Sequence, residues 1–187
     1  DEWNEESQIE WDLLQYDEHH QMQTYMKALM KFYKEQPALF KKDFDPAGFE
    51  WINNISADEN MLVFMRHSGK EEEDLLVVVN FSPLVYEKHR IGVPYSGKFK
   101  EIFNSDSIVF GGDGNTNPRV KPSKKSPCDD REDSIEILVP PMGISVFKCT
   151  RTEEAPKTSP EKKTAAAKKG TRKKKETPAK AAARQVP

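Results

Sequence analysis

Two tryptophans lie among acidic side chains in the first part of the chain. Trp3 and Trp11 share residues 1–18 with eight carboxylates, and no lysine or arginine precedes Lys27. An indole ring can stack on the apolar face of a ring-shaped ligand, while carboxylates and the Asn4 amide can hydrogen-bond its polar groups. We therefore expect Trp3, Asn4 and Trp11 to line a binding site for a polar, ring-shaped ligand. The alternative is that both tryptophans only anchor their segment by packing.

Two further patterns could hold a metal ion, and both fail on spacing. His19 and His20 are adjacent in a helical pattern, so their side chains point in different directions, and no third ligand follows at a useful spacing. Residues 113–117 imitate the start of a calcium-binding loop, but Pro118 replaces its glycine and Lys124 replaces its final glutamate. The sequence therefore predicts no metal site and no cofactor.

One strong helical pattern follows the tryptophans. Apolar residues at steps of three and four predict a helix over residues 17–35, with acidic residues at its start and basic residues near its end. Gln36-Pro37 ends it, because a residue before proline disfavours the helical conformation. A lone helix is marginal in water, so we expect its apolar stripe to pack against something. That stripe comprises Met22, Tyr25, Met26, Leu29, Met30, Phe32 and Tyr33.

From residue 43 onward the pattern changes to short β runs separated by turn signals. Seven runs at nearly even spacing predict an antiparallel β-sandwich of about a hundred residues, so the expected fold class is mainly β. Residues 75–79 are apolar without alternation, as in a central strand buried on both faces. We expect an irregular loop over 105–133 and an exposed hairpin tip over 71–74. The expected strands are 49–55, 61–67, 75–81, 86–93, 98–104, 134–139 and 144–149.

Trp51, in the first of these strands, is a further candidate for ligand binding. Ile52 follows it, and successive side chains of a strand point to opposite faces, so one of the two faces outward. We expect Trp51 to point outward and Phe49 to point inward. The alternative is that Trp51 belongs to the core, as large strand aromatics often do.

The net charge of −2 averages two different segments. Residues 150–187 contain 12 Lys and Arg against 4 Asp and Glu, a formal charge of +8, whereas residues 1–149 contain 17 against 27, a charge of −10. The Lys/Ala/Pro-rich tail cannot bury enough apolar surface to offset chain entropy, so we expect it to be disordered.

No apolar run of about 18 residues is present to span a membrane. Cys128 and Cys149 form no disulfide framework, which favours reduced thiols in a cytoplasmic protein.

Motifs along residues 1–149 follow one another in an order that is more specific than any one of them. They are Glu2-Trp3-Asn4, Trp11-Asp12-Leu13-Leu14, Pro37-Ala38-Leu39-Phe40, the run from Asp43 to Trp51, Asn80-Phe81-Ser82-Pro83, the run from Tyr95 to Asp106, Gly111-Gly112 and the run from Leu138 to Met142. Together they closely resemble the C-terminal end of bacterial 1,4-alpha-glucan (glycogen) branching enzymes of the alpha-amylase superfamily.

The resemblance implies a division into segments. Residues 1–40 would be the last βα loop and final helix of a catalytic (β/α)8 barrel, and residues 41–149 would be the C-terminal β-sandwich domain. Residues 150–187 remain as the disordered tail. Because a run as acidic and aromatic as residues 1–18 is a poor start for a free-standing domain, we expect the chain to be the C-terminal part of a larger protein.

The resemblance also implies an activity, a ligand and a partner. Such enzymes transfer an α-1,4-glucan segment to a 6-hydroxyl, forming α-1,6 branches in glycogen with retention of configuration. Retention needs two carboxylates about 5–5.5 Å apart, and in this superfamily they lie on barrel strands upstream of the first motif. The chain alone is therefore expected to be inactive, to bind α-1,4-glucan or glycogen, and to contact the upstream barrel of the same polypeptide.

The same resemblance implies where the candidate binding residues lie. Trp3, Asn4 and Trp11 fall in the last βα loop, at the face of a (β/α)8 barrel that carries active sites. Trp51 aligns with an aromatic residue near a glucan-contacting surface.

Two other functions remain open. A free-standing, non-catalytic carbohydrate-binding β-sandwich module is one, although residues 1–40 would then have no purpose. A polyanion-binding protein acting through the basic tail is the other, since a charge of +8 binds polyanions weakly and in a salt-dependent manner. The tail could equally be a solubilising extension or a tether. Without the barrel, we expect residues 1–40 to dock imperfectly or fray and residues 43–149 to keep their fold.

Overall fold

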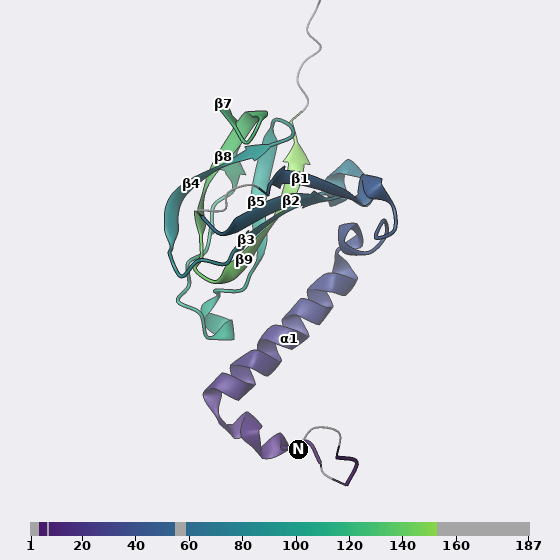
Figure 1. Ribbon diagram of the computed structural model, residues 1–187, viewed down its shortest axis with the longest axis vertical. Coiled ribbons are helices and arrows are strands. Elements are labelled where there is room, and N and C mark those ends of the chain that lie inside the picture. Colours follow the sequence, from purple (N-terminus) through teal and green to yellow (C-terminus); the bar gives the residue numbers. More distant parts are fainter. Residues whose placement is uncertain (1–3, 7, 55–58, 153–187) are drawn as a thin grey trace, which may run out of the picture. The chain divides into compact units, whose positions relative to one another are not determined.

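The structure of the protein is a computed structural model that describes residues 4–6, 8–54 and 59–152. Within these residues the strands form two antiparallel sheets, which confirms the expected mainly β fold class. A six-stranded sheet has the order β1-β2-β3-β9-β5-β6, and a three-stranded sheet has the order β4-β8-β7 (Figure 1). The strands are β1 Phe49–Asn53, β2 Met61–Arg66, β3 Leu75–Asn80, β4 Tyr86–Val93, β5 Gly97–Asn104, β6 Lys121–Pro122, β7 Lys124–Cys128, β8 Arg131–Val139 and β9 Gly143–Arg151.

The main core lies between the two sheets. Every second residue of β2 is buried there, as expected for a strand with one face inward. β3 differs because it is buried on both sides: Leu76 and Val78 face the three-stranded sheet, and Leu75 and Val77 belong to a second apolar cluster on the outer face. This confirms the predicted central strand, since β2 and β9 flank β3 and a helix covers it.

That helix is α1 (Asp17–Glu35), whose bounds agree with the predicted 17–35. It packs on the outer face of the six-stranded sheet, with Phe32 and Tyr25 ring centroids 4.9 and 6.1 Å from that of Phe103. Burial of such aromatic side chains supplies the stability that a lone helix lacks. Short 3-10 helices join the elements: η1 Trp11–Gln15, η2 Pro37–Leu39, η3 Pro46–Gly48, η4 Glu71–Glu73 and η5 Ile108–Phe110.

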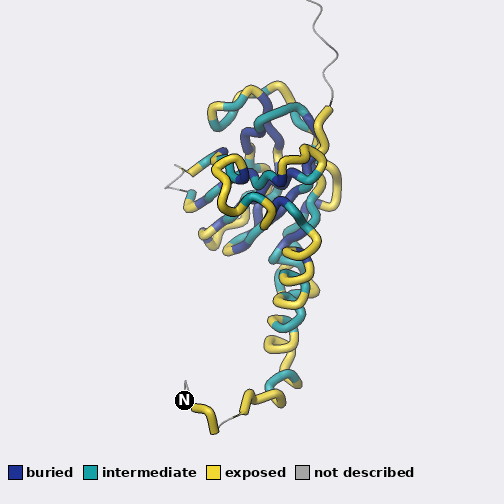
Figure 2. The backbone as a smooth tube through the Cα atoms, turned by 90° about the vertical axis from the view of Figure 1, so that its right-hand side faces the viewer, coloured by how far each residue is buried: buried dark blue, intermediate teal, exposed yellow. Residues whose placement is uncertain are grey.

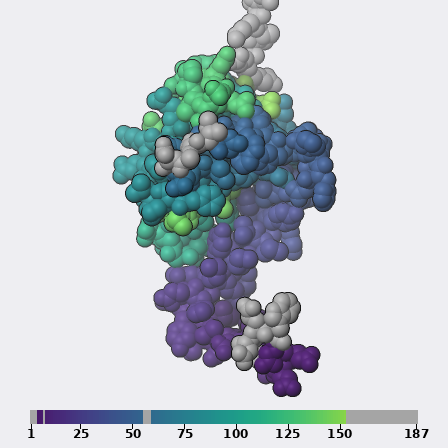
Figure 3. Space-filling model, in the orientation of Figure 1, coloured from purple at the N-terminus to yellow at the C-terminus, as the bar shows by residue number. Residues whose placement is uncertain are grey.

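The apolar stripe of α1 is divided between two sides of the helix. Tyr25, Leu29 and Phe32 pack against the sheet. The other four members, which we call the methionine face, are exposed: Met22, Met26, Met30 and Tyr33. At about 100° per residue the seven positions spread over about 160° of the helix, more than one sheet can cover. Exposed residues run along α1 in Figure 2, and on the face seen in Figure 3 no strand covers its first turns. The prediction of packing is thus confirmed for one side only.

Residues 105–133 contain more regular structure than the expected irregular loop. They include η5, β6, β7 and the start of β8. Asp129 and Asp130, with positive φ values of 51° and 55°, form the tight turn between β7 and β8. The prediction was wrong here because β7 is polar and has little strand propensity of its own; pairing with β8 imposes its conformation.

Two expectations concern residues outside the described ranges. They are the disorder of the tail, of which residues 153–187 lie outside, and the position of Trp3. Across the part of the chain that is described, none of the helices is both long enough and apolar enough to cross a bilayer.

Candidate functional site

An aromatic surface is centred on Trp51 of the edge strand β1. The indole is 45% exposed. Its ring centroid lies 4.8 Å from that of Phe49 and 5.9 Å from that of Phe64, with both ring pairs nearly perpendicular. Phe49 and Phe64 stack on each other at 5.1 Å. We call these three residues the Trp51 platform, because two supporting rings fix the indole and leave part of it open to a ligand.

The pairing of β1 with β2 explains the platform. Trp51 lies opposite Phe64, and Phe49 lies opposite Arg66. Because side chains alternate along a strand, Phe49 and Trp51 share the outer face, while Ile52 is buried between the sheets. The expectation that Phe49 points inward is therefore wrong, and Phe64 is a contributor that the sequence reasoning missed. Phe64 comes 13 residues after Trp51 in the chain, and the pairing of β2 with β1 brings the two side chains together.

The backbone of the platform is tied to the other sheet. Arg131, at the start of β8, donates from Nη2 to the Trp51 carbonyl at 3.2 Å and forms an ion pair with Glu50 at 2.8 Å. The Asn53 amide donates to Asp129 Oδ1 at 2.7 Å. These bonds hold the edge strand against the β7–β8 hairpin, so Trp51 is presented by a fixed backbone.

A partly buried ionic cluster lies beside the platform. His67 lies between Asp74, 3.0 Å from its Nδ1, and Glu50, 3.3 Å from its Nε2. The hydrogen bond to Asp74 raises the pKa of His67 above its ordinary value, although burial opposes this, and Glu50 contributes in the same direction. Asp74 is only 2% exposed and also pairs with Arg151. The prediction of a solvated tip over 71–74 is thus wrong at Asp74, whose charge is buried because it is paired.

The cluster is suited to holding strands together. Its carboxylates are engaged by His67, Arg131 and Arg151. The Tyr95 hydroxyl, which donates to Asp74, has a raised pKa because it is buried. A triad of the hydrolytic type needs a nucleophile that the histidine can activate. The geometry therefore supports a structural role, with β1, β3 and β9 joined around His67.

The other predicted binding residues lie away from the platform. Trp3 is outside the described residues. Asn4 is exposed and its Oδ1 accepts a hydrogen bond from the Glu6 amide at 3.0 Å. Trp11 begins η1 and is 63% exposed. η1, which carries Trp11, and β1, which carries Trp51, lie toward opposite ends of α1 (Figure 1). Because α1 has 19 residues and is about 28 Å long, the two tryptophans do not form one binding site.

The described residues contain no group of three or more His, Cys, Asp or Glu side chains arranged for a metal ion. His19 and His20 are exposed on α1. The loop at 113–117, which imitates a calcium site in sequence, is instead ordered by Asp106, which accepts hydrogen bonds from the Asp113 and Asn115 amides.

Comparison with known proteins assigns this fold to a protein family. Residues 51–150 match the family described as alpha amylase, C-terminal all-beta domain. The chain belongs to this family. The matched range starts at Trp51 and extends through β2 to most of β9, so the domain of this family is the sandwich itself.

Several proteins similar to this chain share the name 1,4-alpha-glucan branching enzyme GlgB. The protein of Prochlorococcus marinus (strain MIT 9515) is 40% identical over 147 residues, which are 79% of this chain and 20% of the relative. That of Geobacillus stearothermophilus is 38% identical over 148 residues, 79% of this chain and 23% of the relative. That of Bacillus cytotoxicus is 32% identical over 163 residues, 87% of this chain and 25% of the relative. The chain thus spans about a fifth to a quarter of the length of these relatives.

The similarity to these relatives extends beyond the domain. An alignment of 147 residues is longer than the hundred residues from 51 to 150. Residues outside 51–150 therefore contribute to the likeness.

Proposed function

We propose that this chain acts as the C-terminal region of a 1,4-alpha-glucan branching enzyme, a cytoplasmic glycosyltransferase of glycogen synthesis. The likeness to proteins of that name, over a length greater than the all-beta domain, carries the proposal. In the complete enzyme an α-1,4-glucan segment is transferred to a 6-hydroxyl with retention, which requires a nucleophilic carboxylate and a carboxylic acid. We assign both to an upstream barrel and neither to this chain.

The domain assignment follows from the two-sided helix. Residues 1–40 are proposed as the last loop and final helix of the barrel, residues 41–149 as the sandwich and residues 150–187 as an appended tail. The support is the methionine face: a helix that is apolar on both sides is suited to burial between two bodies. One body is the sandwich, and the upstream barrel is the second, on the side of Met26, Met30 and Tyr33.

The sandwich is proposed to lend a glucan-binding surface through the Trp51 platform. An exposed indole on a fixed backbone suits the apolar face of a glucose ring, and its burial under a ligand removes apolar area from water. Trp3, Asn4 and Trp11 are proposed as a separate contact with glucan, close to the barrel.

The experiment that tests this role is an activity measurement on the 187-residue chain alone. Incubation with amylose followed by proton NMR of the anomeric region counts α-1,6 linkages. We expect no linkages from this chain and their appearance when the upstream segment is restored. Linkages formed by the chain alone would contradict the assignment of the catalytic residues.

A second role is proposed for the tail because of its charge of +8. It would bind polyanions weakly, through counterion release and without sequence preference. Retention on heparin should fall steeply with salt for the full chain and should be absent for residues 1–152. Equal retention of both chains would exclude this role.

A further inference from the structure

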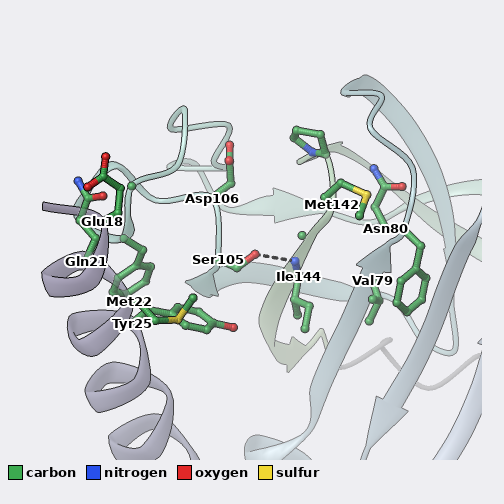
Figure 4. Close-up of a pocket in the computed structure, with 15 residues that line it drawn as sticks. Glu18, Gln21, Met22, Tyr25, Val79, Asn80, Ser105, Asp106, Met142 and Ile144 are labelled. Atoms are coloured by element: carbon green, nitrogen blue, oxygen red, sulfur yellow. Dashed lines mark hydrogen bonds between the residues drawn. The ribbon is translucent and has the colours of Figure 1, made fainter. Parts of the chain in front are cut away.

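A cleft of about 520 Å³ lies between the first half of α1 and one end of the sandwich. Figure 4 shows Met22 and Tyr25 reaching from α1 toward Ser105 and Ile144, with Met142 on the opposite side. Its other walls are the ends of β3 and β5 and the loop before β9. This volume is within the range of small-ligand sites, about 300–1,000 Å³. Asn4, Trp11 and Trp51 do not line this cleft.

The apolar part of the cleft is exposed. Phe81 and Met142 are 57% and 69% exposed, and Met22 on α1 is exposed as well. Tyr25 and Phe110, whose ring centroids are 5.4 Å apart, continue the surface from α1 to η5. A cluster of large apolar side chains that are exposed to solvent in one cleft is typical of a ligand-binding surface.

The polar part of the cleft is available for hydrogen bonds. Glu18 and Gln21 are one helical turn apart on α1, so they share a face of the helix. Within the described chain, neither side chain has a hydrogen bond or ion pair. Gly111 allows η5 to approach them, because a Cβ at that position would lie 2.5 Å from Gln21 Oε1. A carboxylate and an amide therefore face the cleft beside its aromatic rings.

The walls of the cleft are held by their own hydrogen bonds. Asn80 Nδ2 donates to the carbonyls of Leu84 and Pro140 at 2.9 and 2.8 Å, which ties together two of the loops. Ser105 Oγ accepts a hydrogen bond from the Ile144 amide at 2.8 Å. Met142 has a φ of 43°, which is uncommon for a residue other than glycine. Such strain is tolerated where the surroundings fix it, and it is concentrated at functional sites.

The charged side chains that line the cleft restrict the chemical class of its ligand. Among the residues that line the cleft, the charged ones are Glu18 and Asp106, and none is a lysine or an arginine. An anionic ligand such as a phosphate would meet only like charge there. The combination of aromatic rings, a free carboxylate and a free amide suits a neutral ligand with apolar faces and many hydroxyls.

We infer that this cleft binds a second stretch of α-1,4-glucan, apart from the Trp51 platform; the ligand class rests on the proposed function. Val79 of the cleft and Trp51 lie on the same face of the six-stranded sheet. Trp51 pairs with Phe64 and Phe64 with Val77, so strand geometry places the end of β3 roughly 14 Å from Trp51. One glucan chain that crosses the sheet would meet both surfaces.

The methionines of the chain provide the test. With [13C-methyl]-methionine labelling, maltoheptaose is titrated into the full 187-residue chain and methyl signals are followed by NMR. We expect Met22 and Met142 to shift, while Met26 and Met30, exposed on α1 outside the cleft, act as internal controls and do not. The indole N–H signal of Trp51 reports the proposed platform in the same titration.

Two variants assign the shifts to the cleft. Phe81→Ala and Met142→Gly each remove an exposed side chain, and the second also relieves the positive φ, so both should fold. Each is expected to raise the dissociation constant read at Met22 about tenfold, equivalent to about 1.4 kcal/mol, while the Trp51 signal still shifts during the titration. A titration that shifts Trp51 and neither Met22 nor Met142 would overturn the inference alone. A titration that shifts none of these signals would overturn the glucan-binding proposal as well.

Discussion

The two faces of the six-stranded sheet are covered in different ways. The inner face meets the three-stranded sheet, and its central side chains, such as Phe99 and Phe147, are fully buried. The outer face is covered by α1 together with residues of η2 and η5, which pack on Phe103 and its neighbours but leave Trp51 and Phe81 exposed. One face is therefore a closed core, and the other is partly covered with open aromatic surfaces beside the helix.

This difference separates stability from binding. Apolar side chains enclosed on all sides contribute the largest part of the folding free energy, whereas half-exposed aromatic residues contribute less and keep area that a ligand can bury. The inner face should accordingly govern unfolding, and the outer face should govern attachment of the helix and of ligands.

The largest effect on stability is expected in the inner face. Phe147→Ala removes a fully buried ring between the sheets and should lower the free energy of unfolding by about 3–5 kcal/mol, measured by urea denaturation. Phe81→Ala, which removes an exposed ring, is the matched control and should cost less than about 1 kcal/mol. Equal losses in the two variants would remove the distinction between the faces.

A smaller and more local effect is expected for α1. Phe32→Ala should weaken attachment of the helix by about 2 kcal/mol. Amide hydrogen exchange over residues 19–34 should accelerate, while exchange in β3 remains slow. Since only one side of α1 is covered, its amides should exchange faster than those of β3 even in the unchanged chain. Protection of 19–34 equal to that of β3 would contradict the partial attachment of the helix.

A pH-dependent effect is expected at the edge of the sheet, where His67 joins Glu50 and Asp74. Because the pKa of His67 is raised in the folded chain, its protonated form stabilises the fold below its ordinary pKa of 6.5. This contribution is lost as the pH rises through the raised value. As the pH rises above about 6.5, the free energy of unfolding should therefore fall more for the unchanged chain than for His67→Gln. Parallel pH profiles would show that the cluster does not depend on this proton.

Much of the fold could be predicted because the signals are local. The three- and four-residue period sets α1 at Asp17–Glu35, and the strand predicted over Tyr86–Val93 has the bounds of β4. β7 could not be predicted from its own residues, because a polar strand forms only when β8 pairs with it. Asp74 was expected in solvent, since its partners His67 and Arg151 come from other parts of the chain.

The candidate site could be predicted only in part, because some of its contacts join residues that are far apart in the chain. The neighbouring Ile52 indicates that Trp51 points outward, and the structure has Trp51 exposed and Ile52 buried. The support from Phe64 and Arg131 depends on strand register and on contact between sheets, which no local pattern contains. Glu18, Gln21 and Phe81 gave no signal as binding residues, because the cleft arises only when α1 packs beside the sandwich.

Binding of glycogen by the Trp51→Ala variant tests the division between the faces most directly. Affinity electrophoresis in gels that contain glycogen compares it with the unchanged chain and with Trp11→Ala, and urea denaturation is measured in parallel. We predict that Trp51→Ala costs about 1 kcal/mol of stability or less, yet loses most of the retardation that the unchanged chain undergoes. Full retardation of Trp51→Ala, or a loss explained by unfolding, would contradict a glucan-binding role for the outer face.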